Sequence, residues 1–327
     1  MSTLRRWVDP FVLLLLATLA AGLLVPVPEA ARGPLDVTAR AGIALLFFTY
    51  GLRLPTREVH AGLRNIRLQG TILAVTFVLW PLVGLGLSWA SGPLIGTALA
   101  TGVVFLSVLP STVQGSVALT SIAKGNIPAA ITAATASNVA GMVLTPLLVL
   151  LLMGQVATPG FGGVRSVLVQ LLLPFVLGQL LSRWAGEWVR QRKWVTLVVD
   201  RTAICLMLFN AVSAATAQGA WAQVHWSMLV TVGVLALALL AGMSALLWFS
   251  GPKLGLALPE RIVLMLAGSQ KSLATGLPMG AVLFSPATLA TLVVPLIIYH
   301  QLQLILGAML AGQLARRAGG GAAQTKG

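Results

Sequence analysis

The chain has 327 residues, of which 57% are hydrophobic and only 9% are charged, with a mean hydropathy of +0.94. Soluble domains carry about 25% charged residues, so this composition excludes a soluble protein and predicts one that crosses a bilayer several times. The net charge of +14 would also suit a nucleic-acid-binding protein, but the placement of the basic residues, described below, removes the need for that partner. The single cysteine, Cys205, excludes a disulfide framework and a cysteine metal site.

Apolar windows of about 20 residues predict ten membrane spans, separated mostly by short loops. The first apolar stretch follows two arginines as in a signal peptide, but it lacks a small-residue cleavage site, so we interpret it as a retained span. We expect one transmembrane domain over residues 1–317, followed by a disordered Gly/Ala-rich tail over 318–327. The predicted spans are 10–28, 37–54, 66–89, 94–122, 127–153, 165–184, 194–216, 226–250, 259–283 and 286–313.

Basic residues fall unevenly on the two sides of these spans. If the amino terminus is inside, sixteen of the 21 Lys and Arg residues lie in inner segments and three lie in outer ones. The positive-inside rule therefore predicts a multi-pass protein of the cell (inner) membrane with both termini cytoplasmic. The positive charge is then a feature of topology, and the expected surroundings are the lipid bilayer and not a nucleic acid.

Two predicted spans are interrupted by polar residues at membrane depth. The ninth contains LAGSQKSLATGLPMG (Leu266–Gly280), and near its middle lies Lys271, a charge that costs roughly 2.5–3.5 kcal/mol to insert. The fourth is broken at Pro110, which cannot donate a backbone hydrogen bond, and polar residues follow as far as Ser116. Freed backbone groups persist at that depth only where protein or a wet cavity satisfies them. Two broken helices that face each other would form such a cavity.

The two interruptions occupy equivalent places in the two halves of the chain. An offset of 159 residues superimposes Pro110 on Ser269, and each half then holds five spans. An odd number of spans inverts the second half in the membrane, as in many secondary transporters, whose binding sites lie at the interrupted spans. The sequence therefore predicts an all-α polytopic membrane protein with inverted repeats at about 9–153 and 165–313.

The sequences at and near the breaks resemble one family. LPSTVQGSVALTSIAKGNIPAAITAATASN (Leu109–Asn138), GSQKSLATGLP (Gly268–Pro278) and FFTYGLRL (Phe47–Leu54) are similar to the SBF-like branch of the bile acid:sodium symporter superfamily, the bacterial relative of solute carrier family 10 member 7. The resemblance covers essentially the whole chain. It implies ten helices in two inverted five-helix repeats, divided into panel and core subdomains. It also implies that discontinuous helices 4 and 9 cross at the midplane near the substrate site, with alternating access.

The chain departs from the family pattern where sodium would bind. The bile acid branch uses an acidic residue of the ninth helix as a sodium ligand, and that position falls near Leu266, with no carboxylate nearby. The branch's hydroxyl ligands early in the fifth helix fall on alanines, with Thr132 and Thr135 as neighbouring substitutes. Lys271 stands where those relatives carry asparagine. The resemblance therefore does not extend to two-sodium coupling, and the coupling ion stays open between sodium and a proton.

Lys271 is the first candidate site residue. Its ammonium either replaces a sodium ion or titrates during transport, whereas the structural alternative, a lysine that reaches the membrane surface, fits its depth poorly. Asp200 and His300 are candidate proton carriers, with an interfacial role and an interhelical hydrogen bond as their structural alternatives. For the remaining binding candidates the structural alternative is hydrogen bonding between helices. These candidates are Ser269, Gln270, Ser272, Ser111, Thr112, Gln114, Ser116, Thr132, Thr135 and Asn138.

Together these features predict a secondary transporter of a small organic anion, because Lys271 and the amino ends of broken helices contribute positive potential. The alternative is a non-transporting membrane regulator or scaffold that keeps the fold, in line with the link between member 7 and calcium homeostasis. The sequence has no HExxH, GxSxG or Walker A motif, so an enzyme is not expected. No cofactor or metal site is predicted apart from sodium or a proton as coupling ion, and the substrate's identity and the oligomeric state stay open.

Overall fold

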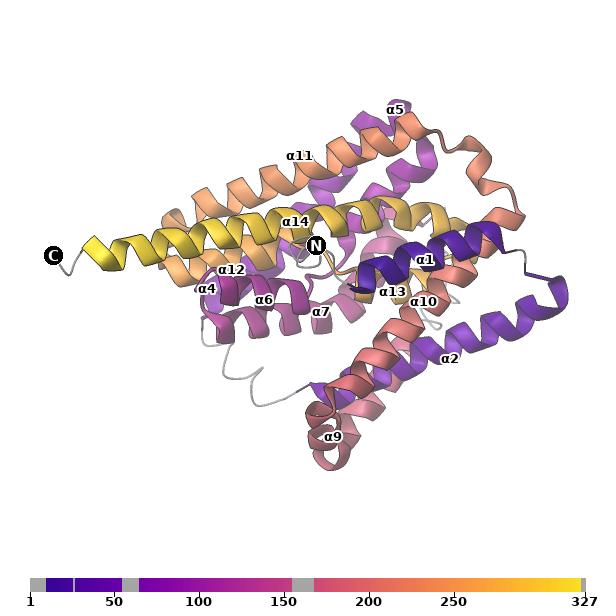
Figure 1. Ribbon diagram of the computed structural model, residues 1–327, viewed down its shortest axis with the longest axis horizontal. Helices are drawn as coiled ribbons and strands as arrows, with labels where there is room; N and C mark the ends of the chain where they lie inside the picture. The colour runs from indigo at the N-terminus through magenta and orange to yellow at the C-terminus, as the bar shows by residue number, and fades with distance from the viewer. Residues whose placement is uncertain (1–9, 26, 55–64, 155–167, 325–327) are drawn as a thin grey trace, which may run out of the picture. The chain divides into compact units, whose positions relative to one another are not determined.

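The computed structural model describes residues 10–25, 27–54, 65–154 and 168–324, and every regular element within these ranges is helical (Figure 1). Helices satisfy all their backbone hydrogen bonds internally, which is why apolar segments in lipid adopt them. Elements η2 and η3 are π-helical, and η4 and η5 are short 3-10 turns. In chain order the elements are α1 (Pro10–Leu24), α2 (Glu29–Arg53), α4 (Ile66–Ala74), η2 (Val75–Leu79), α5 (Trp80–Val108), α6 (Gln114–Ile122), α7 (Ile127–Met153), η3 (Leu168–Leu172), α9 (Leu173–Gln191), α10 (Lys193–Ala217), η4 (Ala220–Gln223), α11 (Trp226–Ser250), η5 (Pro252–Leu254), α12 (Leu258–Ser269), α13 (Leu273–Leu283) and α14 (Pro286–Gln324).

Among the described residues, six helical stretches are each long and apolar enough to cross a membrane, and Leu13–Leu24 is a shorter apolar helix. The predicted ninth span is not among the six, because it is divided into α12 and α13, each shorter than the roughly 20 residues that a bilayer requires. The predicted third span and the first part of the fourth form one stretch, Ile66–Val108. The prediction of an all-helical polytopic membrane protein is confirmed.

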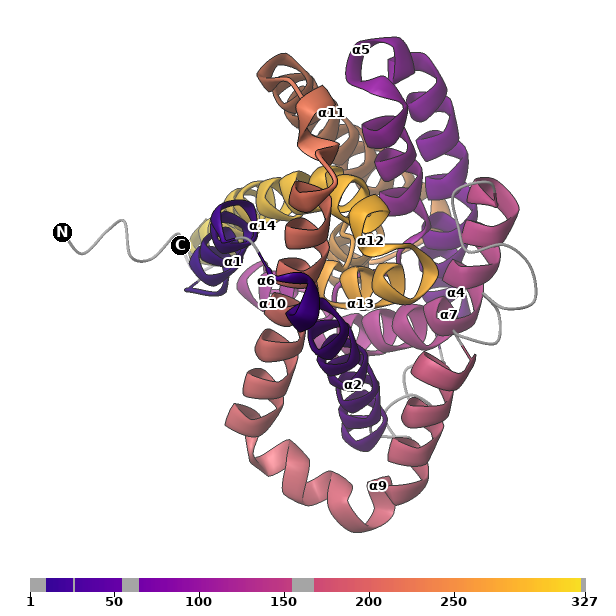
Figure 2. The same cartoon turned by 90° about the vertical axis from the view of Figure 1, so that its right-hand side faces the viewer.

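The stretch Ile66–Val108 changes direction at Gly96, where α5 folds back on itself (Figure 2). The backbone of Gly96 has φ 76° and ψ 158°, which glycine adopts without the clash that a Cβ would cause. Pro93, three residues earlier, removes one helical hydrogen bond. The sequence places the boundary between the third and fourth spans at residues 89–94, and the structure places it a few residues later, at this glycine.

The last helix, α14, continues to Gln324. The sequence instead predicts a disordered tail beginning after Arg317. Helix propagation from a long preceding segment needs only one hydrogen bond per added residue, which explains why a Gly/Ala-rich end remains helical. The final three residues lie outside the described part of the chain.

One compact unit comprises the described parts of residues 1–55, 146–226 and 274–294. Within it, α2 packs along α9, and α1 packs along α10. The backbones of α2 and α9 touch at two glycines: a Cβ on Gly51 would overlap the carbonyl oxygen of Phe175, and one on Gly178 would overlap that of Phe48. Small residues allow such close approach between membrane helices, so these two glycines determine how α2 and α9 pack.

A second compact unit comprises the described parts of residues 56–145, 227–273 and 295–327. In it, α12 packs against α4 and α6. Around α12 lies a buried apolar cluster that includes Leu119 of α6, Ile262 and Leu266 of α12 and Ala311 of α14. This unit contains both of the interruptions predicted from the sequence, and it holds the candidate site.

Candidate functional site

The two helix interruptions lie against each other. The first separates α5, which ends at Val108, from α6, and the second separates α12, which ends at Ser269, from α13. The Ser272 amide donates a hydrogen bond to the Pro110 carbonyl over 2.9 Å, and the Ser111 hydroxyl donates to the Ala267 carbonyl over 2.6 Å. The backbone groups that one break frees are thus partly satisfied by the other break.

Every carbonyl from Ser107 to Thr112, at the first break, accepts a hydrogen bond from outside the regular helix pattern. Such complete pairing is what buried backbone at membrane depth requires. The Thr145 hydroxyl of α7 donates to the Val108 carbonyl over 2.8 Å, and the Asn138 amide of α7 donates to the Ser111 carbonyl over 2.8 Å. The other donors are the Lys271 ammonium, the Ser272 amide and the Ser116 hydroxyl.

The last carbonyls of α12 are capped in the same way. A helix leaves its final carbonyls without intrahelical partners, and here three aromatic or hydroxyl side chains supply them. The Trp80 indole donates to the Gly268 carbonyl over 2.8 Å, and the Tyr299 hydroxyl donates to the Ser269 carbonyl over 2.6 Å. The third donor is the Ser111 hydroxyl already described. The end of α12 is therefore held by α5, by the first break and by α14.

Lys271 is completely buried, and its ammonium is surrounded by backbone carbonyl oxygens. Its Nζ lies 2.7 Å from the Ser107 oxygen, 2.7 Å from the Leu109 oxygen and 3.2 Å from the Thr76 oxygen. It also lies 4.7 Å from the centroid of the Trp80 ring, on which a cation is stabilised. Three acceptors match the three N–H groups of a protonated lysine, and in the described part of the chain no carboxylate pairs with it. The three carbonyl oxygens thus surround the Lys271 ammonium in the way that carbonyl oxygens coordinate a metal cation in other proteins.

The local sequence explains why these three carbonyls are free. The end of α5 releases those of Ser107 and Leu109, and the partial negative charge at a helix carboxyl end favours a cation there. The Thr76 carbonyl lies in the π-helix η2, where the Trp80 amide bonds to Val75 five residues back. The next residue in that register, Pro81, has no N–H to offer Thr76. A π-helical turn followed by proline thus leaves the Thr76 carbonyl of η2 free to accept from Lys271.

Gln303 of α14 holds the backbone of Lys271. Its Oε1 accepts from the Lys271 amide over 2.8 Å, and its Nε2 donates to the Lys271 carbonyl over 2.9 Å. The same Nε2 lies 2.9 Å from His300 Nδ1. Because Nε2 is a donor, Nδ1 must accept, which assigns His300 the neutral tautomer protonated on Nε2. His300 therefore contributes by orienting Gln303, and a proton on Nδ1 would break this hydrogen bond.

Gln270 differs from its neighbours, because its amide has no partner. The side chain is 2% exposed, and neither Nε2 nor Oε1 forms a hydrogen bond within the described residues. The amide lies between α6 and α14: a Cβ on Gly115 would be 3.1 Å from its Oε1, and one on Gly307 would be 3.2 Å from its Nε2. Leaving a buried polar group unpaired costs about 1–3 kcal/mol, so such a group is a place where a bound ligand, ion or water supplies the missing bonds.

The structure does not bring every candidate residue to this place. Gln114 is exposed, the Thr132 hydroxyl bonds to the Pro128 carbonyl of its own helix, and Thr135 is half-buried without a side-chain hydrogen bond in the described part of the chain. Asp200 belongs to the other unit. There it pairs with Arg53 of α2 over 3.1 Å, and the Arg53 guanidinium stacks on Tyr50.

Sequence reasoning missed Trp80, Thr145, Tyr299 and Gln303 as residues of the site. One signal was available for α14, where Tyr299, His300 and Gln303 interrupt an otherwise apolar span at helical spacing. None was available for Trp80, because tryptophan is also common at membrane interfaces. The Thr76 carbonyl is a backbone group that the π-helix sets free, and no side-chain pattern predicts it.

The first unit has a separate polar pocket of about 390 Å³ between α2, η3, α10 and the start of α14. Asp36 and Arg40 of α2 form an ion pair over 2.9 Å at its wall, and the Asn210 amide of α10 donates to Asp36 over 3.1 Å. Gln170 and Ser285 complete its polar lining. From the sequence, Arg40 was considered only as one of the basic residues that indicate membrane orientation. Its place in a pocket could not be predicted, because the pocket depends on the tertiary contact between α2 and α10.

A helical membrane protein with two touching helix breaks and a cation bound between them has the architecture of a secondary transporter. The family model of the SBF-like CPA transporter family matches residues 9–316. The chain therefore belongs to that family, which confirms the resemblance seen in the sequence.

Individual relatives agree with this assignment. The chain is 40% identical to the Uncharacterized protein PA2026 of Pseudomonas aeruginosa, over 97% of this chain and 96% of the relative. It is 38% identical to the Putative symporter YfeH of Escherichia coli, over 96% and 95% of the two chains. It is 27% identical to the Sodium/bile acid cotransporter 7 of Mus musculus, over 94% of this chain and 91% of that one. The protein is thus a transporter of this superfamily.

Proposed function

We propose that the protein is a secondary active transporter that moves a small organic anion across the cytoplasmic membrane by alternating access, with the Lys271 ammonium as a resident cation in the site. The observation that carries this proposal is the carbonyl coordination of Lys271 between the two helix breaks. Carbonyl oxygens replace the hydration shell of a metal cation in ion-conducting proteins. Here the lysine supplies the positive charge that a sodium ion would supply in a relative.

The positive charge of Lys271 favours an anionic solute even though its three N–H groups are already used. No carboxylate in the described part of the chain neutralises it, and in a medium of low dielectric constant an uncompensated charge acts over several ångströms. The free amide of Gln270, next to Lys271 in the chain, supplies hydrogen bonds for a polar solute or a coupling ion. Ser111, Thr112, Ser116, Ser269, Ser272 and Asn138 then shape the site, partly through the backbone that they hold.

The same proposal extends to the transmembrane arrangement. Ten spans in two inverted repeats are supported by the two breaks at equivalent sequence positions and by their mutual contact. An inner-membrane location with both termini cytoplasmic is supported by the distribution of Lys and Arg. The coupling ion is either sodium or a proton, and Asp200 and His300 remain the candidate proton carriers.

A flux assay tests the transport function. The purified protein in proteoliposomes should accumulate radiolabelled small carboxylates when a sodium or proton gradient is imposed. Replacement of sodium by N-methyl-D-glucamine separates the two coupling ions, because only sodium coupling would then lose its driving force. Absence of flux for every anion under every gradient would contradict transport and favour the non-transporting regulator.

Substitution of Gln270 by leucine tests the site itself. The change removes two unpaired buried polar atoms, so we expect thermal stability in detergent to stay the same or rise, while anion uptake falls at least tenfold. Gln218→Leu, at the exposed end of α10, is the matched control and should leave uptake unchanged. If Q270L lowers stability and uptake together, Gln270 is a packing residue and its assignment to the site is wrong.

A further inference from the structure

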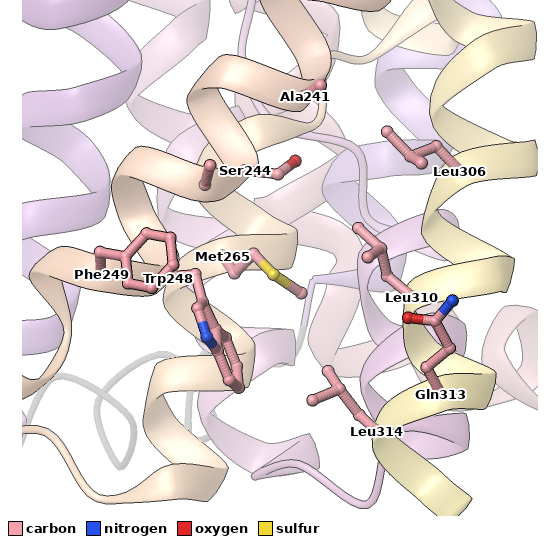
Figure 3. A pocket seen from close by; sticks show the side chains of 10 residues that line it. Ala241, Ser244, Trp248, Phe249, Met265, Leu306, Leu310, Gln313 and Leu314 are labelled. Carbon is pink, nitrogen blue, oxygen red and sulfur yellow. The ribbon is translucent and has the colours of Figure 1, made fainter.

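A second feature of the same unit lies away from the helix breaks. A groove of about 270 Å³ runs between α11 and α14, with α12 behind it. Leu306, Leu310 and Leu314 of α14 face Trp248 and Phe249 of α11, and Met265 of α12 lies between them (Figure 3). The residues recur at helical spacing on both long helices, so the groove follows their axes. Its lining is almost entirely apolar.

The groove opens toward lipid and not toward water. On the same two helices the lining residue Phe249 is 69% exposed, and the apolar neighbours of the groove are also exposed: Leu246 50%, Ile305 53% and Met309 49%. In a protein that spans a membrane, exposed apolar side chains of long helices face the hydrocarbon. An elongated apolar cavity at such a surface has the shape and polarity of an acyl chain.

One end of the groove carries an arginine in a defined position. The Arg261 guanidinium carbon lies 3.8 Å from the centroid of the Trp248 ring, and its Nε donates to the Trp248 carbonyl over 2.6 Å. Its stem packs on Gly251, where a Cβ would come within 2.6 Å of Arg261 Cγ. Glycine at that position therefore makes room for the arginine. Trp248 connects the two features, because it also lines the groove.

The outer nitrogens of this guanidinium have no partner within the described residues. In the described part of the chain no carboxylate pairs with Arg261, and the adjacent Glu260 instead accepts from the Asn65 amide over 2.7 Å. A guanidinium held by its Nε and its ring contact presents two parallel N–H groups, the arrangement that binds phosphate oxygens in a bidentate manner. Arg261 lies in the first turn of α12, just after the α11–α12 connection. The predicted topology places this connection at the cytoplasmic face, which is the depth of lipid phosphates.

We propose that this groove is a binding site for an anionic phospholipid, with one acyl chain between α11 and α14 and the phosphate on Arg261. Lys253 of η5 and Arg316 of α14 add positive charge at the same end of these helices and favour an anionic headgroup over a zwitterionic one. The site is separate from the solute site, because its lining does not include Lys271 or Gln270.

Native mass spectrometry of the full-length protein tests the proposal. Detergent-solubilised protein is titrated with phosphatidylglycerol or with phosphatidylcholine of the same acyl chains, and the lipid-bound fraction is measured. We expect the wild type to prefer phosphatidylglycerol, and Arg261→Gln to weaken the binding of both lipids about tenfold, because both carry the phosphate that Arg261 binds. The matched control is Arg183→Gln, because Arg183 stacks on Trp184 at 3.9 Å in the same manner but does not line this groove.

A second variant tests the acyl half of the site without removing a charge. Ala245→Phe fills the groove from α11, so we expect it to reduce the binding of both lipids. Equal binding of the two lipids by the wild type, or unchanged binding of both lipids by R261Q, would overturn the proposal. So would displacement of phosphatidylglycerol by inorganic phosphate alone, since the groove would then contribute nothing.

Discussion

At the scale of single residues, Lys271 is a charged group that the protein satisfies without an opposite charge. Its three N–H groups meet the three carbonyl oxygens of Thr76, Ser107 and Leu109. Two of these oxygens lie at a helix carboxyl end, whose dipole stabilises a cation. A carboxylate would have neutralised the site, whereas carbonyls stabilise the charge and leave the net positive potential in place. That potential is what an anionic solute requires.

Removal of the ammonium should leave a site for a small cation. Lys271→Ala frees three buried carbonyls, each of which costs about 1–3 kcal/mol when unpaired, so we expect a large loss of thermal stability. Sodium or methylammonium should restore part of that loss, because a cation that binds only the folded state stabilises it by mass action. The measurement is the melting temperature of K271A in detergent, with N-methyl-D-glucamine as the reference cation.

Wild-type protein is the control in that experiment, because its own ammonium already fills the carbonyl site. The result to compare is the increase in melting temperature that sodium causes in K271A, minus the increase that it causes in the wild type. If the two proteins respond equally to sodium, the carbonyls do not form a cation site in the absence of the lysine, and the analogy with a bound metal ion fails.

At the scale of elements, the site depends on places where helices stop being regular. The breaks at 109–113 and 270–272 free backbone groups, and the π-helix η2 frees one more. The sequence predicted both breaks from proline and clustered polar residues, and the structure has them at those places. It did not predict η2, because the segment VTFVL before Trp80 and Pro81 is also compatible with an ordinary apolar helix. The role of η2 becomes clear only from the tertiary structure, in which its Thr76 carbonyl accepts a hydrogen bond from Lys271.

Pro81 should be needed for the function of η2 and not for the stability of the helix. Pro81→Ala restores an N–H that competes with Lys271 for the carbonyl oxygens of this turn, so we expect anion uptake to fall several-fold while the melting temperature changes little or rises. Pro93→Ala, an exposed proline near the Gly96 turn of the same helix, is the control and should leave uptake unchanged. Equal uptake in P81A and wild type would show that the Thr76 carbonyl contributes nothing to transport.

At the scale of the whole molecule, boundaries between the two units fall within four of the described helices. They lie at Pro146 in α7, between Trp226 and Ser227 in α11, between Leu273 and Ala274 in α13, and at Pro295 in α14. Prolines within membrane helices interrupt the hydrogen-bond ladder. Contact between residues distant in sequence, such as Arg53 with Asp200 in one unit and Asn138 with Ser111 in the other, holds each unit together internally.

The topology itself makes a prediction for the intact protein in a bacterial membrane. With both termini cytoplasmic, green fluorescent protein fused after Arg316 should fluoresce, and alkaline phosphatase fused there should be inactive. At Gly219, in the turn between α10 and η4, the two reporters should give the reverse result, since the predicted ten-span arrangement places that turn on the outer side. The same result at both positions would exclude an odd number of spans between them and hence the ten-span arrangement.

The sequence by itself determined the class of protein, the approximate ends of most helices, the two breaks and the family. These follow from apolar length, from proline and glycine, and from charge, which are local properties of the chain. It also identified Lys271 as an expensive charge, but not the groups that bind it. Tertiary structure alone decided that Trp80, Tyr299 and Gln303 hold the second break, and that Gln270 is left without a partner. Tertiary structure alone also showed that Asp200 forms an ion pair with Arg53. The physical reason is that the satisfaction of a buried polar group depends on which distant backbone carbonyls and side chains the packing of helices brings within about 3 Å, and no local pattern contains that information.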